Sequence, residues 1–187
     1  KKGLFEKAFA DHYKGIIEYR PNNELKQVDA ASNSGKLEFD DVKADVLNVV
    51  PPQRAGDIAR TAGLVNMNSR WVGVNWLTME STAVPGIHVL GDATFSAPMM
   101  PKSGHMANQH AKVAAAAIIE LLKGQPVSAA PVVMNTCYSF VTARDVIHVA
   151  SVHQYDDKDK TFKTVPGSGG VSAAANQVEG RAALAWA

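Results

Sequence analysis

The sequence lacks the features that would indicate a covalent framework, a membrane span or a nucleic-acid partner. Its only cysteine is Cys137, so no disulfide can form within the chain, and a lone thiol is either an inert buried side chain or a reactive group. No apolar run approaches the roughly 20 residues that a membrane-spanning helix needs. The formal net charge of +1 gives no electrostatic case for nucleic acid or an anionic membrane. We therefore expect neither partner.

A glycine-rich nucleotide-binding turn is also absent. A parallel nucleotide-binding sheet usually opens with a strand and a Gly-x-Gly-x-x-Gly turn, and the sequence has no such turn. Residues 166–170 are rich in glycine, but no apolar strand-to-helix pattern surrounds them, so we interpret them as a loop. The 187 residues, 46% of them hydrophobic, are enough for one domain or two small ones.

Hydrophobic periodicity predicts an α/β region followed by an antiparallel β region. Two of the expected strands, residues 45–50 and 87–90, are short apolar runs of the kind that a buried strand shows. Helices are predicted over residues 4–13, 57–62, 101–123 and 176–186. Strands are predicted over residues 16–20, 25–30, 36–39, 45–50, 71–75, 77–79, 87–90, 132–134, 139–142, 146–152 and 161–165.

The strongest chemical signal lies where the strand at 87–90 meets Gly91-Asp92 and the long helix follows. Backbone N–H groups at a helix N-terminus favour an anion, and the Asp92 carboxylate can accept hydrogen bonds from hydroxyl groups. This pattern indicates a site for a phosphate- or ribityl-bearing ligand. The alternative is that Asp92 only caps a turn or helix.

The histidines give no metal-binding pattern. His105 and His110 are five residues apart, which puts them on different faces of a helix instead of at the i, i+4 spacing of a zinc helix. His88 lies within an apolar run and is expected to be a core histidine with its hydrogen bonds satisfied. We expect no metal site.

Several runs, in chain order, carry a family resemblance: residues 49–56, 80–81, 85–93, 97–103, 111–117 and 135–139. They resemble the flavin-binding subunit of flavocytochrome c sulfide dehydrogenase, a sulfide:cytochrome c oxidoreductase. Gly-Asp-Ala alone would indicate only the wider class of flavoproteins with two dinucleotide-binding domains, which includes glutathione-reductase-like enzymes. The Pro-Pro-Gln-Arg-Ala-Gly and Asn-Thr-Cys-Tyr-Ser runs narrow the resemblance.

The resemblance implies an α/β fold, part of such a two-dinucleotide-binding-domain flavoprotein, of which this chain is the C-terminal half. Residues 1–48 would end an NAD-like middle domain, 49–125 would be the second half of the FAD-binding domain, and 126–187 a C-terminal α+β interface domain. The missing N-terminal half would carry the glycine-rich turn, the cysteine that attaches the flavin and the first cysteine of a redox pair.

The resemblance also implies which residues act. Cys137 would be the second cysteine of the redox pair, facing the flavin where sulfide is oxidised. A helix starting at Met100–Ser103 would direct its N–H groups at the pyrimidine edge of the flavin, where Lys102 would either add charge or be solvated. The cofactor is expected to be FAD. The expected cofactor-binding residues are Gly91, Asp92, Ala93, Met100, Pro101, Lys102, Ser103 and Trp186.

The function implied is oxidation of sulfide with electrons passed through the flavin to a c-type cytochrome subunit, in the periplasm. Two alternatives stay open: a sulfide:quinone-type oxidoreductase, and a non-catalytic interaction module that lacks half of the FAD site. Because the neighbours of the strand at 87–90 would belong to the missing half, its edges would be unpaired. We therefore expect the isolated chain to form a homo-oligomer or to pair with another chain.

Overall fold

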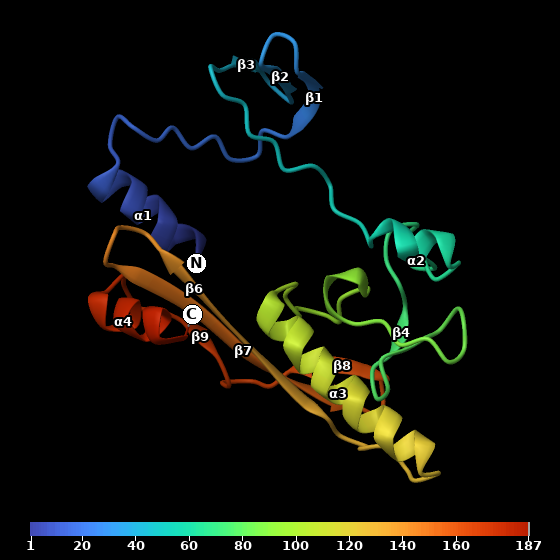
Figure 1. Ribbon diagram of the computed structural model, residues 1–187. Helices are drawn as coiled ribbons and strands as arrows, with labels where there is room; N and C mark the ends of the chain where they lie inside the picture. Colours follow the sequence, from blue (N-terminus) through green and yellow to red (C-terminus); the bar gives the residue numbers. More distant parts are fainter. Residues whose placement is uncertain (187) are drawn as a thin grey trace. The chain divides into compact units, whose positions relative to one another are not determined.

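The computed structural model describes residues 1–186, with side chains for residues 1–185. The chain forms two compact units: unit 1 comprises Lys1–Ala8 and Gln53–Ala187, and unit 2 comprises Phe9–Pro52. Helices and sheets are both present, in agreement with the predicted mixed α/β composition (Figure 1). The predicted domain limits at residues 48 and 125 stay a prediction.

Unit 2 is built around a small antiparallel sheet. Strands β1 (Leu25–Asp29), β2 (Ser34–Leu37) and β3 (Asp41–Lys43) pair in chain order. The turn between β1 and β2 contains Asn33 in the left-handed region, with φ of 51°, a conformation that asparagine tolerates better than most residues. The predicted hairpin is therefore confirmed.

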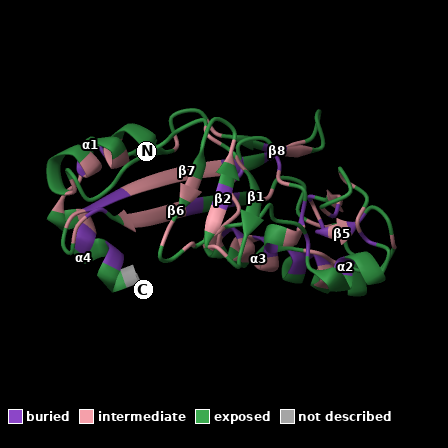
Figure 2. Cartoon of the chain, turned by 90° about the horizontal axis from the view of Figure 1, so that it is seen from above, coloured by how far each residue is buried: buried purple, intermediate pink, exposed green. Residues whose placement is uncertain are grey.

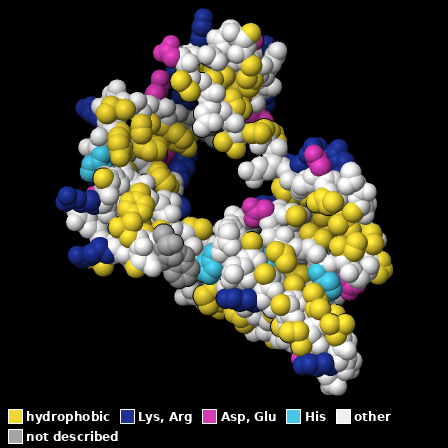
Figure 3. All heavy atoms as spheres, in the orientation of Figure 1, with side chains coloured by type: hydrophobic (Ala, Val, Ile, Leu, Met, Phe, Trp, Pro, Cys, Tyr) yellow, Lys and Arg dark blue, Asp and Glu magenta, His cyan; other side chains and the backbone are white. Residues whose placement is uncertain are grey.

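Two strands predicted in unit 2 are wrong. Residues 16–20 and 45–50 form no strand, and Ile16, Val46 and Val50 are 79%, 83% and 77% exposed. An apolar β-branched run favours a strand only where a neighbouring strand offers hydrogen bonds and a packing surface, and no described strand pairs with either segment. Most residues of this unit are exposed (Figure 2), and hydrophobic side chains lie on its surface (Figure 3).

A long antiparallel hairpin forms the framework of unit 1 (Figure 1). Strand β6 (Val132–Phe140) pairs along its whole length with β7 (Val146–Asp156). Strands β8 (Thr161–Thr164) and β9 (Gly170–Val171) pair with β7, so β6 is an edge strand. The prediction of two short strands at 132–134 and 139–142 is wrong, because the unbroken register makes β6 one strand.

All four predicted helices are present, with ends that differ from the prediction by up to three residues. Helix α3 (Gly104–Leu122) packs on β6 and ends before Gly124, whose φ is 66°. Helix α4 (Gln177–Trp186) packs on β7 near the other end of the hairpin (Figure 1). The remaining helices are α1 (Lys2–His12), whose Ala8 is buried with Val141 and Ile147, and the short α2 (Asp57–Thr61).

The segment that leads to α3 has little regular structure. It contains only the short strands β4 (Val74–Asn75) and β5 (Glu80–Ser81) and the 3₁₀ turn η1 (Gly91–Ala93). The predicted buried strand at 87–90 is wrong: only His88 forms an isolated bridge, and the apolar residues at the two ends of the run are more than one-third exposed. A fully buried strand needs covered faces and paired edges, which this segment does not have in the described chain.

The core of unit 1 lies between α3 and the β6–β8 sheet. The ring of Trp76 meets Phe162 edge-on, with centroids 5.6 Å apart, and packs on His110 of α3 at 5.5 Å. This packing fixes the helix on the sheet. The buried members of the cluster are Trp76, Met79, Ala97, Met100, Met106, Ala114, Val133, Tyr155 and Phe162.

Candidate functional site

The turn at Gly91 is pressed against α3. Gly91 has φ of +67°, and a Cβ at this position would lie 3.0 Å from the Cβ of Ala107, so both the backbone conformation and the space favour glycine. Its N–H donates to Nδ1 of His110 at 3.1 Å. The Gly-Asp-Ala turn is therefore held at a defined place on the helix.

Lys102 also holds this turn, through hydrogen bonds to its backbone. Its ammonium donates to the backbone oxygens of Asp92 and Thr94 at 2.7 and 2.6 Å, and lies 3.9 Å from the centroid of the Trp71 ring. Burial lowers the pKa of Lys102, and the nearby Asp92 opposes that effect. Lys102 is therefore not a solvated lysine. Its ammonium group is bound within the chain, and these contacts hold the turn in place.

The carboxylate of Asp92 has no such structural task. The residue is exposed, and no side chain caps the N-terminus of η1. Among the described residues, the carboxylate accepts no hydrogen bond, so the capping alternative does not describe it. The Asp92 carboxylate is therefore available to a ligand, while hydrogen bonds from Gly91 and Lys102 hold the backbone of its turn in place.

His110 was not expected at the site. Its side chain is buried, and burial, aided by the positive charge of Lys102, lowers its pKa to about 4 against the opposing effect of Asp92. At neutral pH, Nδ1 is therefore an acceptor for Gly91, and Nε2–H points at Sδ of Met100, 3.4 Å away. The sequence shows only a histidine on a helix, so nothing in it indicates this contact.

The start of α3 differs from the prediction. The helix begins at Gly104, and Ser103 is its N-cap, with Oγ accepting the N–H of Met106 at 3.0 Å. Met100 is a core residue and Pro101 precedes the cap, so placing the helix start at Met100–Ser103 was wrong by a few residues. Gly104 is exposed, and nothing lies within 4 Å of the position its Cβ would take, so a ligand can approach the backbone there.

Cys137 lies on β6, next to the same helix end. Its half-buried thiol is 3.2 Å from Nδ2 of Asn135, and Oδ1 of Asn135 is 2.5 Å from Oγ of Ser103. The N–H of Thr136 also donates to Nδ1 of His105, in the first turn of α3. Two hydrogen bonds, Ser103 to Asn135 and Thr136 to His105, thus connect the strand that carries the thiol to the N-terminus of α3.

The structure therefore gathers most of the expected site residues at one end of α3. Gly91, Asp92 and Ala93 form the turn, Lys102 anchors it, and Ser103 links the helix to the Cys137 strand. The side chain of Trp186, the last helical residue of α4, lies outside the described residues. His88 forms a hydrogen bond as expected, with Nδ1 donating to the oxygen of Thr78 at 2.8 Å, but it is half-buried and not part of the core.

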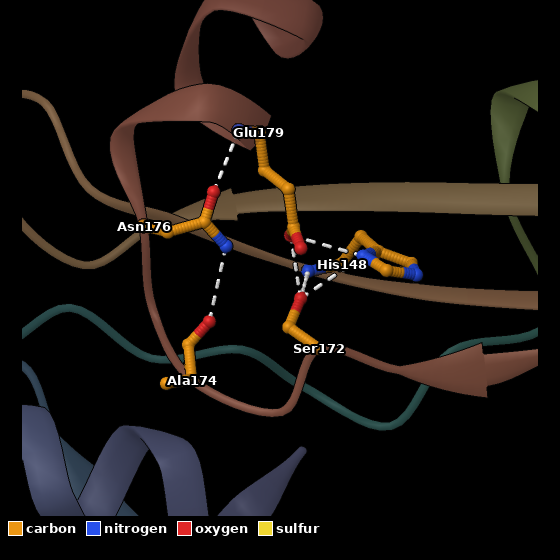
Figure 4. Close-up of polar contacts among 5 residues, drawn as sticks. All are labelled: His148, Ser172, Ala174, Asn176 and Glu179. Atoms are coloured by element: carbon orange, nitrogen blue, oxygen red, sulfur yellow. Dashed lines mark hydrogen bonds and ion pairs between the residues drawn. The ribbon is translucent and has the colours of Figure 1, made fainter.

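A second polar cluster joins α4 to β7 and was not expected from the sequence (Figure 4). Ser172 donates to Oε2 of Glu179 at 2.5 Å, and Nδ1 of His148 lies 2.9 Å from both Oε2 of Glu179 and Oγ of Ser172. A serine–histidine–acid relay would use the two different nitrogens of the ring. Because Ser172 and Glu179 both contact Nδ1, the cluster is not such a relay. Its hydrogen bonds hold α4 against β7.

Within the described residues, there is no group of three or more His, Cys, Asp and Glu side chains that could hold a metal ion. The same part of the chain contains no helix that combines the length and apolar character needed to cross a membrane.

Comparison with protein families gives the class first. Residues 129–187, which include Cys137, match the family model described as flavocytochrome c sulphide dehydrogenase, flavin-binding, so the chain is of a flavin-binding oxidoreductase class. Residues 1–51 match the model described as sulfide dehydrogenase (flavocytochrome c) flavoprotein chain, central. The chain belongs to the flavoprotein chain of flavocytochrome c sulfide dehydrogenase, a family whose complex implies a cytochrome partner. The Gly91–Ser103 site lies between the two matched ranges.

Proposed function

We propose that this chain contributes the ribityl and isoalloxazine side of an FAD site in a sulfide dehydrogenase. The pyrophosphate would be held by a glycine-rich turn that this sequence does not contain. Oxidation of HS⁻ to zero-valent sulfur releases two electrons and one proton. A bound flavin supplies the two-electron acceptor, and a c-type cytochrome takes the electrons one at a time.

The observation that carries the proposal is that one helix end connects the Gly-Asp-Ala turn and the thiol. His110 of α3 binds the turn, and Lys102, just before the helix, also binds it. Ser103, the N-cap, connects the helix to Cys137 through Asn135. These contacts all lie within unit 1. A flavin bound near the start of α3 would therefore have a hydroxyl acceptor and a thiol from the same unit.

The donor set fits a flavin. Asp92 has a free carboxylate that can accept hydrogen bonds from ribityl hydroxyl groups. The N-terminus of the 19-residue helix α3 presents partial positive charge, which stabilises the negative charge that a reduced flavin carries at its pyrimidine edge. Cys137 would meet sulfide there, together with a second thiol from outside this chain, since the sequence contains one cysteine.

Titration of the purified chain with FAD, followed by visible absorption, tests the proposal. We expect bands shifted from those of free FAD, and Asp92→Ala should weaken binding about tenfold, the size of a lost hydrogen bond to a charged acceptor. Asp57→Ala is the matched control, because Asp57 is an exposed aspartate of the same unit that pairs only with Arg54 among the described residues. A spectrum of free FAD alone, or equal affinities for both variants, would contradict the assignment.

The electron acceptor is a separate part of the proposal. The family name supports a c-type cytochrome, and such a partner agrees with a periplasmic location. With the assembled flavoprotein, sulfide should reduce a c-type cytochrome faster than a soluble quinone. Faster reduction of the quinone would favour the sulfide:quinone alternative.

A further inference from the structure

Asn135 is a buried amide that lies between the helix cap and the thiol. It is 2% exposed and precedes Cys137 by two residues on β6, so the two side chains project from the same face of the strand. Its Oδ1 is 2.5 Å from Oγ of Ser103, and its Nδ2 is 3.2 Å from Sγ of Cys137. Both ends of the amide are thus occupied.

Ser103 determines which end of the amide faces the sulfur. Its Oγ already accepts the N–H of Met106 as the N-cap of α3, and a hydroxyl group has one proton to donate. In the structure that proton is donated to Oδ1 of Asn135. The NH₂ end then faces Cys137. The distances agree: 3.2 Å for Nδ2 donating to Sγ, against 3.7 Å for the thiol donating to Oδ1.

We propose that Asn135, oriented by Ser103, is a positioning residue that directs an amide N–H at the sulfur of Cys137 and favours its thiolate. The inference rests on the proposed function only in taking Cys137 as the reacting thiol. The thiol proton leaves to solvent, and no other bond forms or breaks. Hydrogen bonds donated to an ionised group are stronger than those to a neutral one, and the thiolate is the nucleophilic form.

Alkylation of the intact chain by iodoacetamide measures this effect without flavin or sulfide. The single cysteine makes the alkylation rate specific for Cys137. Asn135→Ala removes the donor. We expect its alkylation rate at neutral pH to fall about threefold to tenfold, because a charged hydrogen bond is lost while the remaining thiolate becomes somewhat more nucleophilic.

Variants at Ser103 separate orientation of the amide from capping of the helix. Ser103→Gly keeps most of the N-cap stability, to within a few tenths of a kcal/mol, but cannot donate to Asn135, so the amide is free to turn. Its alkylation rate should fall about threefold, part of the effect of losing the hydrogen bond. Ser103→Thr keeps the hydroxyl group and should restore the wild-type alkylation rate. Circular dichroism of all variants confirms that α3 is retained.

A wild-type alkylation rate for Asn135→Ala would overturn the proposal, and so would equal rates for Ser103→Gly and Ser103→Thr. A slower rate for Asn135→Ala and Ser103→Gly, with recovery in Ser103→Thr, supports it. Because no flavin is present, failure here leaves the FAD proposal untouched. Equally, failure of FAD to bind would leave the alkylation result standing.

Discussion

His110 should make the stability of unit 1 depend on pH. It is 2% exposed, its ring packs on Trp76, and its pKa is lowered from 6.5 to about 4, chiefly by burial. Between these two values the unfolded chain binds a proton that the folded chain does not. The free energy of unfolding therefore falls as the pH is lowered from about 6.5 to about 4, and this contribution levels off below that range.

The expected size follows from the same shift. A difference of about 2.5 pH units between the folded and unfolded pKa of His110 is worth about 3 kcal/mol, since each unit corresponds to about 1.4 kcal/mol. Protonated His110 can no longer accept the N–H of Gly91, so the Gly-Asp-Ala turn should loosen together with the helix contact. Acid should thus weaken the proposed flavin site as well as the fold of unit 1.

The variant His110→Asn isolates this effect. Its side-chain oxygen can replace Nδ1 as acceptor for Gly91, but it does not titrate. Urea unfolding followed by tryptophan fluorescence reports on unit 1, which contains every tryptophan of the sequence. Between pH 7 and pH 4 the variant should lose about 3 kcal/mol less than the wild type. His12→Asn, at an exposed histidine, is the control for losing one histidine. Parallel pH profiles for wild type and His110→Asn would refute the reasoning.

Two further predictions concern the anchors of the turn and of α4. Lys102→Met keeps the apolar stem but removes two hydrogen bonds to backbone oxygens. Urea unfolding should show a loss of about 1–3 kcal/mol, and NMR should show the His110 pKa raised, because a nearby positive charge is gone. In the other cluster, burial acts to raise the pKa of Glu179, but hydrogen bonds led by those from Ser172 and His148 hold that pKa below its usual value. The ionised Glu179 therefore contributes to stability above pH about 4.5, and this contribution is lost as the pH falls through its lower folded pKa. Glu179→Gln should therefore speed amide exchange in α4 several-fold at pH 7 but have little effect in strong acid, and unchanged exchange at pH 7 would contradict this role (Figure 4).

The sequence was sufficient to predict the elements whose signals are local. The apolar spacing of α3, its end at Gly124 and the β1–β2 hairpin depend on periodicity and turn residues, which the chain carries within a few positions. The sequence also identifies the family, from runs such as that around Cys137, and the family models confirm that family.

Tertiary structure alone decided how the site is built. The apolar run at 87–90 predicts a buried strand, yet it has no paired neighbour and stays partly exposed, because a strand needs a partner that its own sequence cannot specify. The contacts of His110 with Gly91, and of Ser103 with Asn135, join residues 19 and 32 positions apart. Such contacts depend on how a helix packs against a turn and a sheet, so only the folded chain shows which polar side chains anchor the site and which, like that of Asp92, are left for a ligand.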